Sequence, residues 1–341
     1  MLAAVAVGMP VAALAGPRTE AGGGDFRLAD ARIGESSGLV LSRRHPHVVW
    51  TANDSGDSAR VFAVDTRTGT TVGVHRFGAD VQDVEALAMT PDGRLLVGDV
   101  GDNGSRRTSV RVYWFEEPEL GQTSGPAASW ELRYPDGPHD AESLAVNPLT
   151  GRVYVVTKGL TGGVYALPAN PSRTGVNRLT RVGAAPSVAT DAVYLADGSA
   201  LAVRTYLALV LLDARDFSRV GSTPLPPQPQ GETISLAPDG HGLLVGSEGV
   251  HTLVQEVAIP ALPLAAHSAP GATTSAAPPS SGAASSPVRV AASPTRPDGG
   301  GEPDGSVAAL NPGVLLAGLG ACALLVLLAV VVTRMARRGR R

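Results

Sequence analysis

The 341-residue sequence contains almost no cysteine. Its one cysteine, Cys322, lies in an apolar run near the C-terminus, so no disulfide framework can form within the chain. Lysine is equally scarce, because Lys158 is the only one. Residues 25–260 also lack an amphipathic pattern of helical period and useful length. This absence argues against a Rossmann domain and against an α/β-hydrolase domain.

Excess positive charge is also missing from most of the chain. The formal charge is −3, but the last eight residues carry five arginines, and without them the remainder has a charge of −8. Binding to nucleic acid normally requires a basic face, so we expect no nucleic-acid partner. An acidic domain is better suited to cationic partners, metal ions included.

Two apolar segments lie near the ends of the chain. Residues 2–15 end in Ala13-Leu14-Ala15, which suits signal peptidase, so we predict a signal peptide over residues 1–15; an uncleaved anchor is the alternative. Residues 313–332 are uncharged and would span about 30 Å as a helix, the thickness of the bilayer core. The basic residues 333–341 are expected in the cytoplasm. We therefore expect a single-pass protein of the plasma membrane with its N-terminal domain outside.

A low-complexity segment separates the middle of the chain from the predicted membrane helix. Residues 261–310 consist mainly of Ala, Pro, Ser, Thr and Gly, and they cannot bury enough apolar area to offset the entropy of ordering. We predict a disordered stalk there. Residues 25–260 are then the folded ectodomain.

The ectodomain repeats itself. Five segments share an acidic residue, small residues and an apolar strand, and they begin at Glu35, Glu85, Glu142, Asp191 and Glu232. A turn signal such as Pro91-Asp92-Gly93 and further β-rich runs follow each start. Four short strands per repeat of this length are typical of a β-propeller blade.

The repeats predict an all-β fold, a five-bladed β-propeller. The fifth repeat ends near Ile259 after three strands, and an unassigned strand at residues 26–31 precedes the first repeat. We expect this strand to complete the fifth blade and close the ring, which removes exposed sheet edges. Six blades would result if residues 100–137 held a degenerate repeat.

Acidic residues recur where propeller geometry would bring them to one mouth of the central channel. Clustered carboxylates repel one another unless a cation offsets their charge, and oxygen ligands suit calcium or magnesium. Turn capping by Asp and Asn is the structural alternative for each loop. The candidate metal ligands are Asp54, Glu85, Asp99, Asp102, Asn103, Glu142, Glu232 and Glu248.

Two cationic residues belong to the same predicted mouth. Lys158 and Arg204 follow the second strands of the third and fourth repeats. They would either pair with the carboxylates as a structural ion network or bind an anionic substrate over a metal.

Several segments resemble exported actinobacterial propeller proteins. The likeness covers residues 34–250 and rests on ESSGL at 35–39, WTANDSGD at 50–57, DVEALA at 83–88, VGDVGDN at 97–103, YPDGPHDAESL at 134–144 and GSEG at 246–249. These proteins are similar to the group described as WD40-like, SMP-30-like or "esterase-like activity of phytase". That resemblance implies a propeller and a calcium-dependent esterase, lactonase or phytase activity. The dipeptide WD is absent from every repeat.

Three functional hypotheses follow. The first is a membrane-tethered propeller that binds a cation, with calcium as the candidate cofactor, and a small-molecule or cell-surface ligand at its channel mouth. The second is a calcium-dependent hydrolase, in which the metal would activate water. The third is a scaffold for a protein partner.

Overall fold

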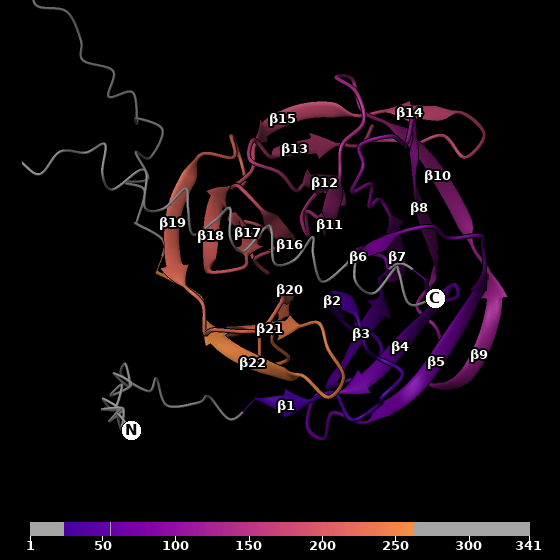
Figure 1. Ribbon diagram of the computed structural model, residues 1–341, viewed down its shortest axis with the longest axis vertical. Coiled ribbons are helices and arrows are strands. Elements are labelled where there is room, and N and C mark those ends of the chain that lie inside the picture. Colours follow the sequence, from indigo (N-terminus) through magenta and orange to yellow (C-terminus); the bar gives the residue numbers. More distant parts are fainter. Residues whose placement is uncertain (1–23, 55, 262–341) are drawn as a thin grey trace, which may run out of the picture. The chain divides into compact units, whose positions relative to one another are not determined.

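A computed structural model describes residues 24–54 and 56–261 of the chain. These residues form twenty-two strands and no helix, and the strands make five sheets around a common centre (Figure 1). The all-β, five-bladed propeller predicted from the repeats is therefore confirmed. The predicted signal peptide (1–15), membrane helix (313–332), cytoplasmic tail (333–341) and nearly all of the predicted stalk lie outside the described residues. Among the described residues, no helix is long and apolar enough to cross a membrane.

The first two blades have five strands each. Blade one contains β2 (Ser36–Leu41), β3 (Val48–Asn53), β4 (Arg60–Asp65), β5 (Thr71–Gly78) and β9 (Gly121–Pro126). Blade two contains β6 (Val84–Met89), β7 (Arg94–Asp99), β8 (Val110–Glu116), β10 (Ala128–Arg133) and β14 (Val176–Arg178).

The other three blades have four strands each. Blade three contains β11 (Ala141–Val146), β12 (Val153–Thr157), β13 (Gly163–Ala166) and β15 (Thr180–Ala184). Blade four contains β16 (Ala189–Tyr194), β17 (Ala200–Thr205), β18 (Ala208–Asp213) and β19 (Arg219–Pro224). Blade five contains β20 (Gly231–Leu236), β21 (Gly242–Ser247), β22 (Leu253–Ala258) and β1 (Phe26–Arg27).

The N-terminal strand closes the ring. Strand β1 pairs antiparallel with β22, with Phe26 opposite Val254, so the first and last described strands share blade five (Figure 1). This pairing confirms the predicted closure. Five hydrophobic clusters each join two neighbouring blades, and the cluster containing Phe26 and Val254 also contains Val49 of blade one. The core is therefore a ring of interfaces between blades.

Residues 100–137 do not form a sixth blade. They supply β8 and β10 to blade two, while β9 crosses back and pairs in parallel with β5 at the outer edge of blade one. Strand β9 has the sequence GQTSGP, with no alternating apolar residues to pack in a new core. The run at 177–182 divides between β14 on the edge of blade two and β15 of blade three.

The innermost strands share a local irregularity. In every blade, the pairing of the first strand with the second skips one residue near the start of the first strand, as in a β-bulge. The skipped residues are Gly38, Glu85, Glu142, Thr190 and Glu232. Glu35 and Asp191, which begin their repeats in the sequence, are therefore not equivalent to the three glutamates. Gly38 has φ +76°, and a Cβ there would lie 2.5 Å from the backbone nitrogen of Leu87, so only glycine fits.

Candidate functional site

The two faces of the disc carry different connections. We call the face that carries the connections after the second and fourth strands of each blade the mouth face, and the opposite face the turn face. Turns such as that around Gly93 lie on the turn face, where glycine adopts a positive φ. At that end, the channel opens into a cavity of about 130 Å³ lined mainly by apolar residues, among them Leu41, Met89, Val146 and Leu236. The mouth face holds the acidic residues.

Three carboxylates converge at the mouth between blades one and two. Asp54 follows β3, Asp83 precedes β6, and Glu85 lies in the irregular part of β6. Each offers one oxygen, and these oxygens lie within 4.8 Å of one another. Such a group of oxygen ligands matches the donors that calcium prefers.

The electrostatics of Glu85 indicate a strongly perturbed carboxyl group. Its side chain is fully buried, and burial, followed by the charges of Glu142 and Asp54, raises its pKa well above the usual range. The Ser37 hydroxyl donates to Oε2 at 2.9 Å, whereas Oε1 has no hydrogen-bond partner among the described residues. A buried carboxylate oxygen without a donor is costly, and a cation beside it would remove that cost.

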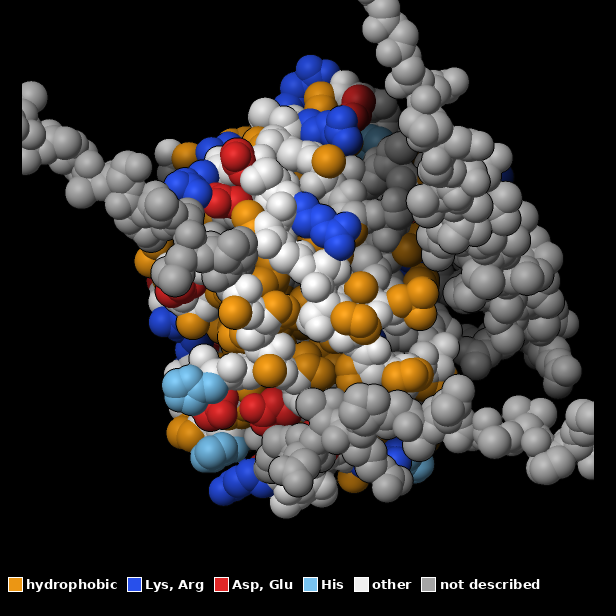
Figure 2. All heavy atoms as spheres, turned by 90° about the vertical axis from the view of Figure 1, so that its left-hand side faces the viewer, with side chains coloured by type: hydrophobic (Ala, Val, Ile, Leu, Met, Phe, Trp, Pro, Cys, Tyr) orange, Lys and Arg blue, Asp and Glu red, His pale blue; other side chains and the backbone are white. Residues whose placement is uncertain are grey.

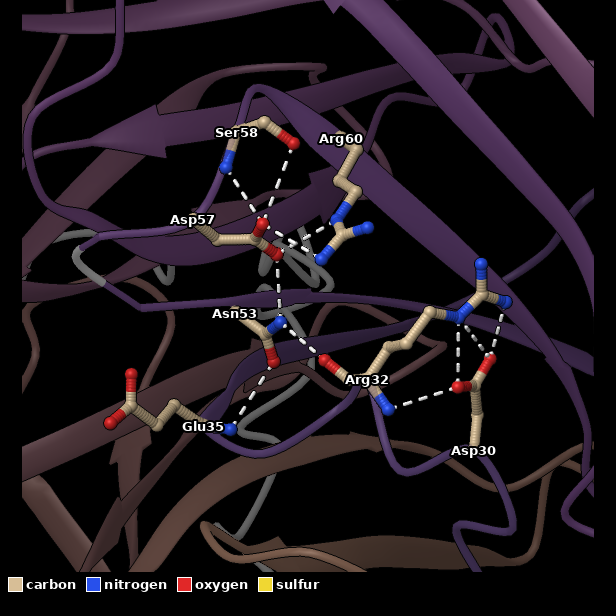
Figure 3. A network of polar contacts seen from close by, with 7 residues as sticks. All are labelled: Asp30, Arg32, Glu35, Asn53, Asp57, Ser58 and Arg60. Carbon is tan, nitrogen blue, oxygen red and sulfur yellow. Dashed lines mark hydrogen bonds and ion pairs between the residues drawn. The ribbon is translucent and has the colours of Figure 1, made fainter.

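A polar network fixes the loop that carries Asp54 (Figure 3). The Asn53 side chain donates to Asp57 Oδ2 at 2.7 Å and accepts the Glu35 amide at 3.2 Å. Arg60 forms an ion pair with Asp57 at 2.8 Å, and the Ser58 amide donates to the same carboxylate at 2.7 Å. These contacts give Asn53 and Asp57 of the segment WTANDSGD a structural role in this loop.

Asp99 ends β7 and Asp102 lies in the loop that follows, and both bind protein groups. Arg107 Nη1 donates to Asp99 Oδ1 at 2.8 Å, and the amides of Gln82 and Asp83 also donate to Asp99. The Arg107 amide donates to Asp102 Oδ2 at 2.7 Å. Asp99 therefore orients the segment that presents Asp83. The neighbouring Asn103 lies exposed on the same loop.

A second group of charges joins blades three, four and five. Lys158 Nζ donates to Glu142 Oε1 at 2.8 Å and lies 5.4 Å from the centre of the Tyr206 ring. The Tyr206 hydroxyl donates to Glu232 Oε1 at 3.1 Å. Burial alone would lower the pKa of Lys158, but Glu142 and Glu232 raise it well above its usual value. The ammonium is therefore the charged counter-ion of this part of the mouth.

Arg204 and Asp191 lie deeper in the propeller. The Arg204 guanidinium is fully buried and donates to the Thr233 carbonyl at 2.8 Å and to Gln228 Oε1 at 2.5 Å. Asp191 accepts the Ile234 amide at 2.8 Å, and burial raises its pKa well above the usual range. Both side chains tie blade four to blade five.

Glu248 lies on the mouth face of blade five. Its side chain is buried, and its amide donates to the Gln230 carbonyl at 2.9 Å. The next amide, that of Gly249, donates to Gly34 at 2.9 Å, so this loop also touches the connection into blade one.

Sequence reasoning missed three residues of the site. Asp83 precedes Glu85, the expected start of the second repeat, by two positions. Its carboxylate was a signal in the sequence that could have placed it in the acidic mouth. Arg107 and Tyr206 show no motif, because their roles depend on contacts made across loops and between blades. The grouping of Asp54 with Glu85 also depends on the packing of blade one against blade two.

The strand arrangement defines the class of protein, a five-bladed β-propeller. No protein-family model matches the sequence, and no curated protein matches it. Among solved structures, it is similar to a chain of a mitotic checkpoint complex crystal structure, with 14% identity, a TM-score of 0.38, and coverage of 65% of this chain and 60% of that one. It is also similar to the Myceliophteria thermophila Cps50 (Swd1) β-propeller domain, with 16% identity, a TM-score of 0.37, and coverage of 63% and 62%. The chain thus spans less than two thirds of either protein's length. The resemblance to exported actinobacterial propellers stays a prediction.

Proposed function

We propose that this protein is a membrane-tethered extracytoplasmic propeller that binds a divalent cation, with calcium as the best match, and recognises a ligand at its mouth. Asp54, Asp83 and Glu85 would be the cation ligands. The observation that supports this proposal is the approach of three carboxylate oxygens to within 4.8 Å, one of them from a fully buried glutamate. The membrane tether in the proposal rests on residues 313–332 of the sequence.

The chemistry of the group favours an alkaline-earth ion. All three side chains offer oxygen, and no histidine or cysteine belongs to the group. Oxygen-only sets suit calcium or magnesium, whereas zinc prefers nitrogen and sulfur. The nearby ammonium of Lys158 is already paired with Glu142 at 2.8 Å, so it does not neutralise this side of the mouth in full.

Thermal unfolding with added calcium and with excess chelator tests the proposal. A ligand present at 100 times its dissociation constant and bound only by the folded state adds about 2.7 kcal/mol, which raises Tm by several degrees. We expect this rise in the unmodified chain and its loss in Asp83→Asn. Asp216→Asn is the matched control, because Asp216 lies in an exposed turn on the opposite face. An equal Tm with calcium and with chelator would contradict the proposal.

A further inference from the structure

The mouth face divides into two chemically different parts. We call the connections after β1, β3, β5, β7 and β10 the charged half, and those after β12, β15, β17, β19 and β21 the aliphatic half. The charged half contains the ion pairs of Asp57 and Asp99 described above. In the aliphatic half, the residues with charged side chains are Lys158 and Glu248, and both are largely buried.

Exposed aliphatic side chains recur at equivalent places in the aliphatic half. Leu160, Leu207 and Val250 lie on the loops between the second and third strands of blades three, four and five, and they are 77%, 76% and 53% exposed. Single exposed leucines are ordinary, but three on the same loop of consecutive blades form a pattern. None of the large hydrophobic side chains exposed among the described residues lies in the charged half.

The backbone beneath these side chains is held firmly. The connection after β19 has the sequence LPPQPQ, and Gln228 within it binds Arg204 and the Val245 carbonyl. Val188, after β15, has φ +53°, a strained conformation for a β-branched residue, and its amide donates to the Gly159 carbonyl at 2.9 Å. Apolar groups on a rigid backbone lose little entropy when a partner covers them.

Apolar surface continues around blade four. Figure 2, which faces the side of the disc formed by blade four, shows hydrophobic side chains gathered across its middle, with most acidic and basic side chains above and below them. Strand β19 forms the outer edge of blade four, because this blade has no fifth strand. In blades one and two, the fifth strands β9 and β14 cover the corresponding edge.

The neighbouring mouth supplies negative charge. Glu142 and Glu232 are fully buried and share one ammonium, that of Lys158, while Asp54, Asp83 and Glu85 lie on the side of blades one and two. Burial raises the pKa of both Glu85 and Glu142, so the negative charge rests on the other carboxylates of the mouth. These include Asp54, Asp83, Glu232 and Glu248, and they outnumber the cationic Lys158 and Arg204. A partner seated on the aliphatic half therefore meets an acidic field at its inner edge.

We propose that the aliphatic half is a docking surface for a peptide segment of a protein partner in which a basic side chain is flanked by aliphatic ones. The aliphatic side chains cover Leu160, Leu207 and Val250, and the basic side chain points toward the acidic mouth. This inference rests on the proposed function, because it names the partner that the mouth face would recognise. The contribution of the aliphatic side chains to binding, however, does not require a bound cation.

A peptide-retention experiment tests this inference. The full chain, reconstituted in nanodiscs of zwitterionic lipid, is exposed to a pool of pentapeptides with a central arginine and Leu, Ile or Val at the other positions. Two matched pools replace the arginine by glutamine or the aliphatic residues by serine and threonine. We expect at least tenfold greater retention of the first pool than of either matched pool.

Substitutions locate the surface. Leu160→Gln/Leu207→Gln should remove most of the retention, whereas Leu149→Gln, at a side chain 73% exposed on the turn face, should leave it unchanged. Equal retention of the three pools, or equal effects of the two variants, would overturn the inference. Repeating the experiment with chelator separates the two proposals: retention that persists without any calcium effect on Tm supports the docking surface and refutes the cation site. A calcium effect on Tm without selective retention of the first pool supports the cation site and refutes the docking surface.

Discussion

The two halves of the mouth face show how one repeat pattern can carry two kinds of surface. In the charged half, loops are held by buried or partly buried ion pairs, such as that of Arg107 with Asp99. In the aliphatic half, three of the corresponding loops expose the aliphatic side chains of Leu160, Leu207 and Val250. The inner four strands of every blade pair in the same antiparallel order, whereas only blades one and two carry an added outer strand, so the two surfaces differ chiefly in their loops. A repeated scaffold thus leaves its loops able to differ from blade to blade.

Lys158 lies where the two halves meet, and its removal should have the largest effect. Lys158→Met leaves Glu142 buried without its counter-ion, which we expect to lower the free energy of unfolding by about 3–5 kcal/mol. Chemical denaturation measures this loss. The double variant Lys158→Met/Glu142→Gln should recover part of it, because the unpaired charge is then absent. A single variant as stable as the unmodified chain would contradict the assigned role of Lys158.

Adjacent arginines provide the next comparison. Arg107→Met should cost about 3 kcal/mol, because it leaves Asp99 almost fully buried without its ion pair. Arg106→Met is the matched control: Arg106 is exposed, so we expect a change within about 0.5 kcal/mol. Equal losses in the two variants, measured by denaturant unfolding, would show that the charged half is not held by the Arg107–Asp99 pair.

The loop network of Figure 3 should have a smaller effect on stability. Asp57→Ala removes hydrogen bonds from Asn53, Ser58 and Arg60, and we expect a loss of about 1–3 kcal/mol. Because this network holds the loop that carries Asp54, calcium affinity measured by titration should also fall. An unchanged affinity would separate the network from the cation site.

The last expected effect, smallest when counted per pH unit, is a change in the pH dependence of stability. The pKa of Glu85 is raised in the folded state by burial, so the folded state holds its proton more tightly than the unfolded chain does. With chelator present, the free energy of unfolding should therefore fall as pH rises above about 4.5, by at most about 1.4 kcal/mol per pH unit for this group. Glu85→Gln should lose this component. If the free energies of unfolding of the unmodified chain and of Glu85→Gln changed in parallel with pH, this result would argue against a raised pKa of Glu85.

The fold was largely predictable, because turn signals and apolar runs are local features. Spacing and turns gave the five blades, and the missing fourth strand of the last repeat gave the closure by β1. The fifth strands β9 and β14 were not predictable, because they pair with strands distant in sequence and have little apolar character.

The site was predictable only in outline. Repeat position pointed to Glu85, Glu142 and Glu232, which all lie in the irregular part of the first strand. The interactions that distinguish these glutamates are made with residues of other blades, such as Ser37 for Glu85 and Tyr206 for Glu232. The exposure of Leu160, Leu207 and Val250 on one face also required the ring, since their loops are far apart in sequence.

Calorimetric titration of the chelator-treated full chain with calcium tests the central claim most directly. The arrangement of Asp54, Asp83 and Glu85 predicts one calcium ion per chain, binding that is lost in Asp83→Asn and binding that is retained in Asp216→Asn. Absence of saturable binding, or an unchanged isotherm in Asp83→Asn, would contradict it.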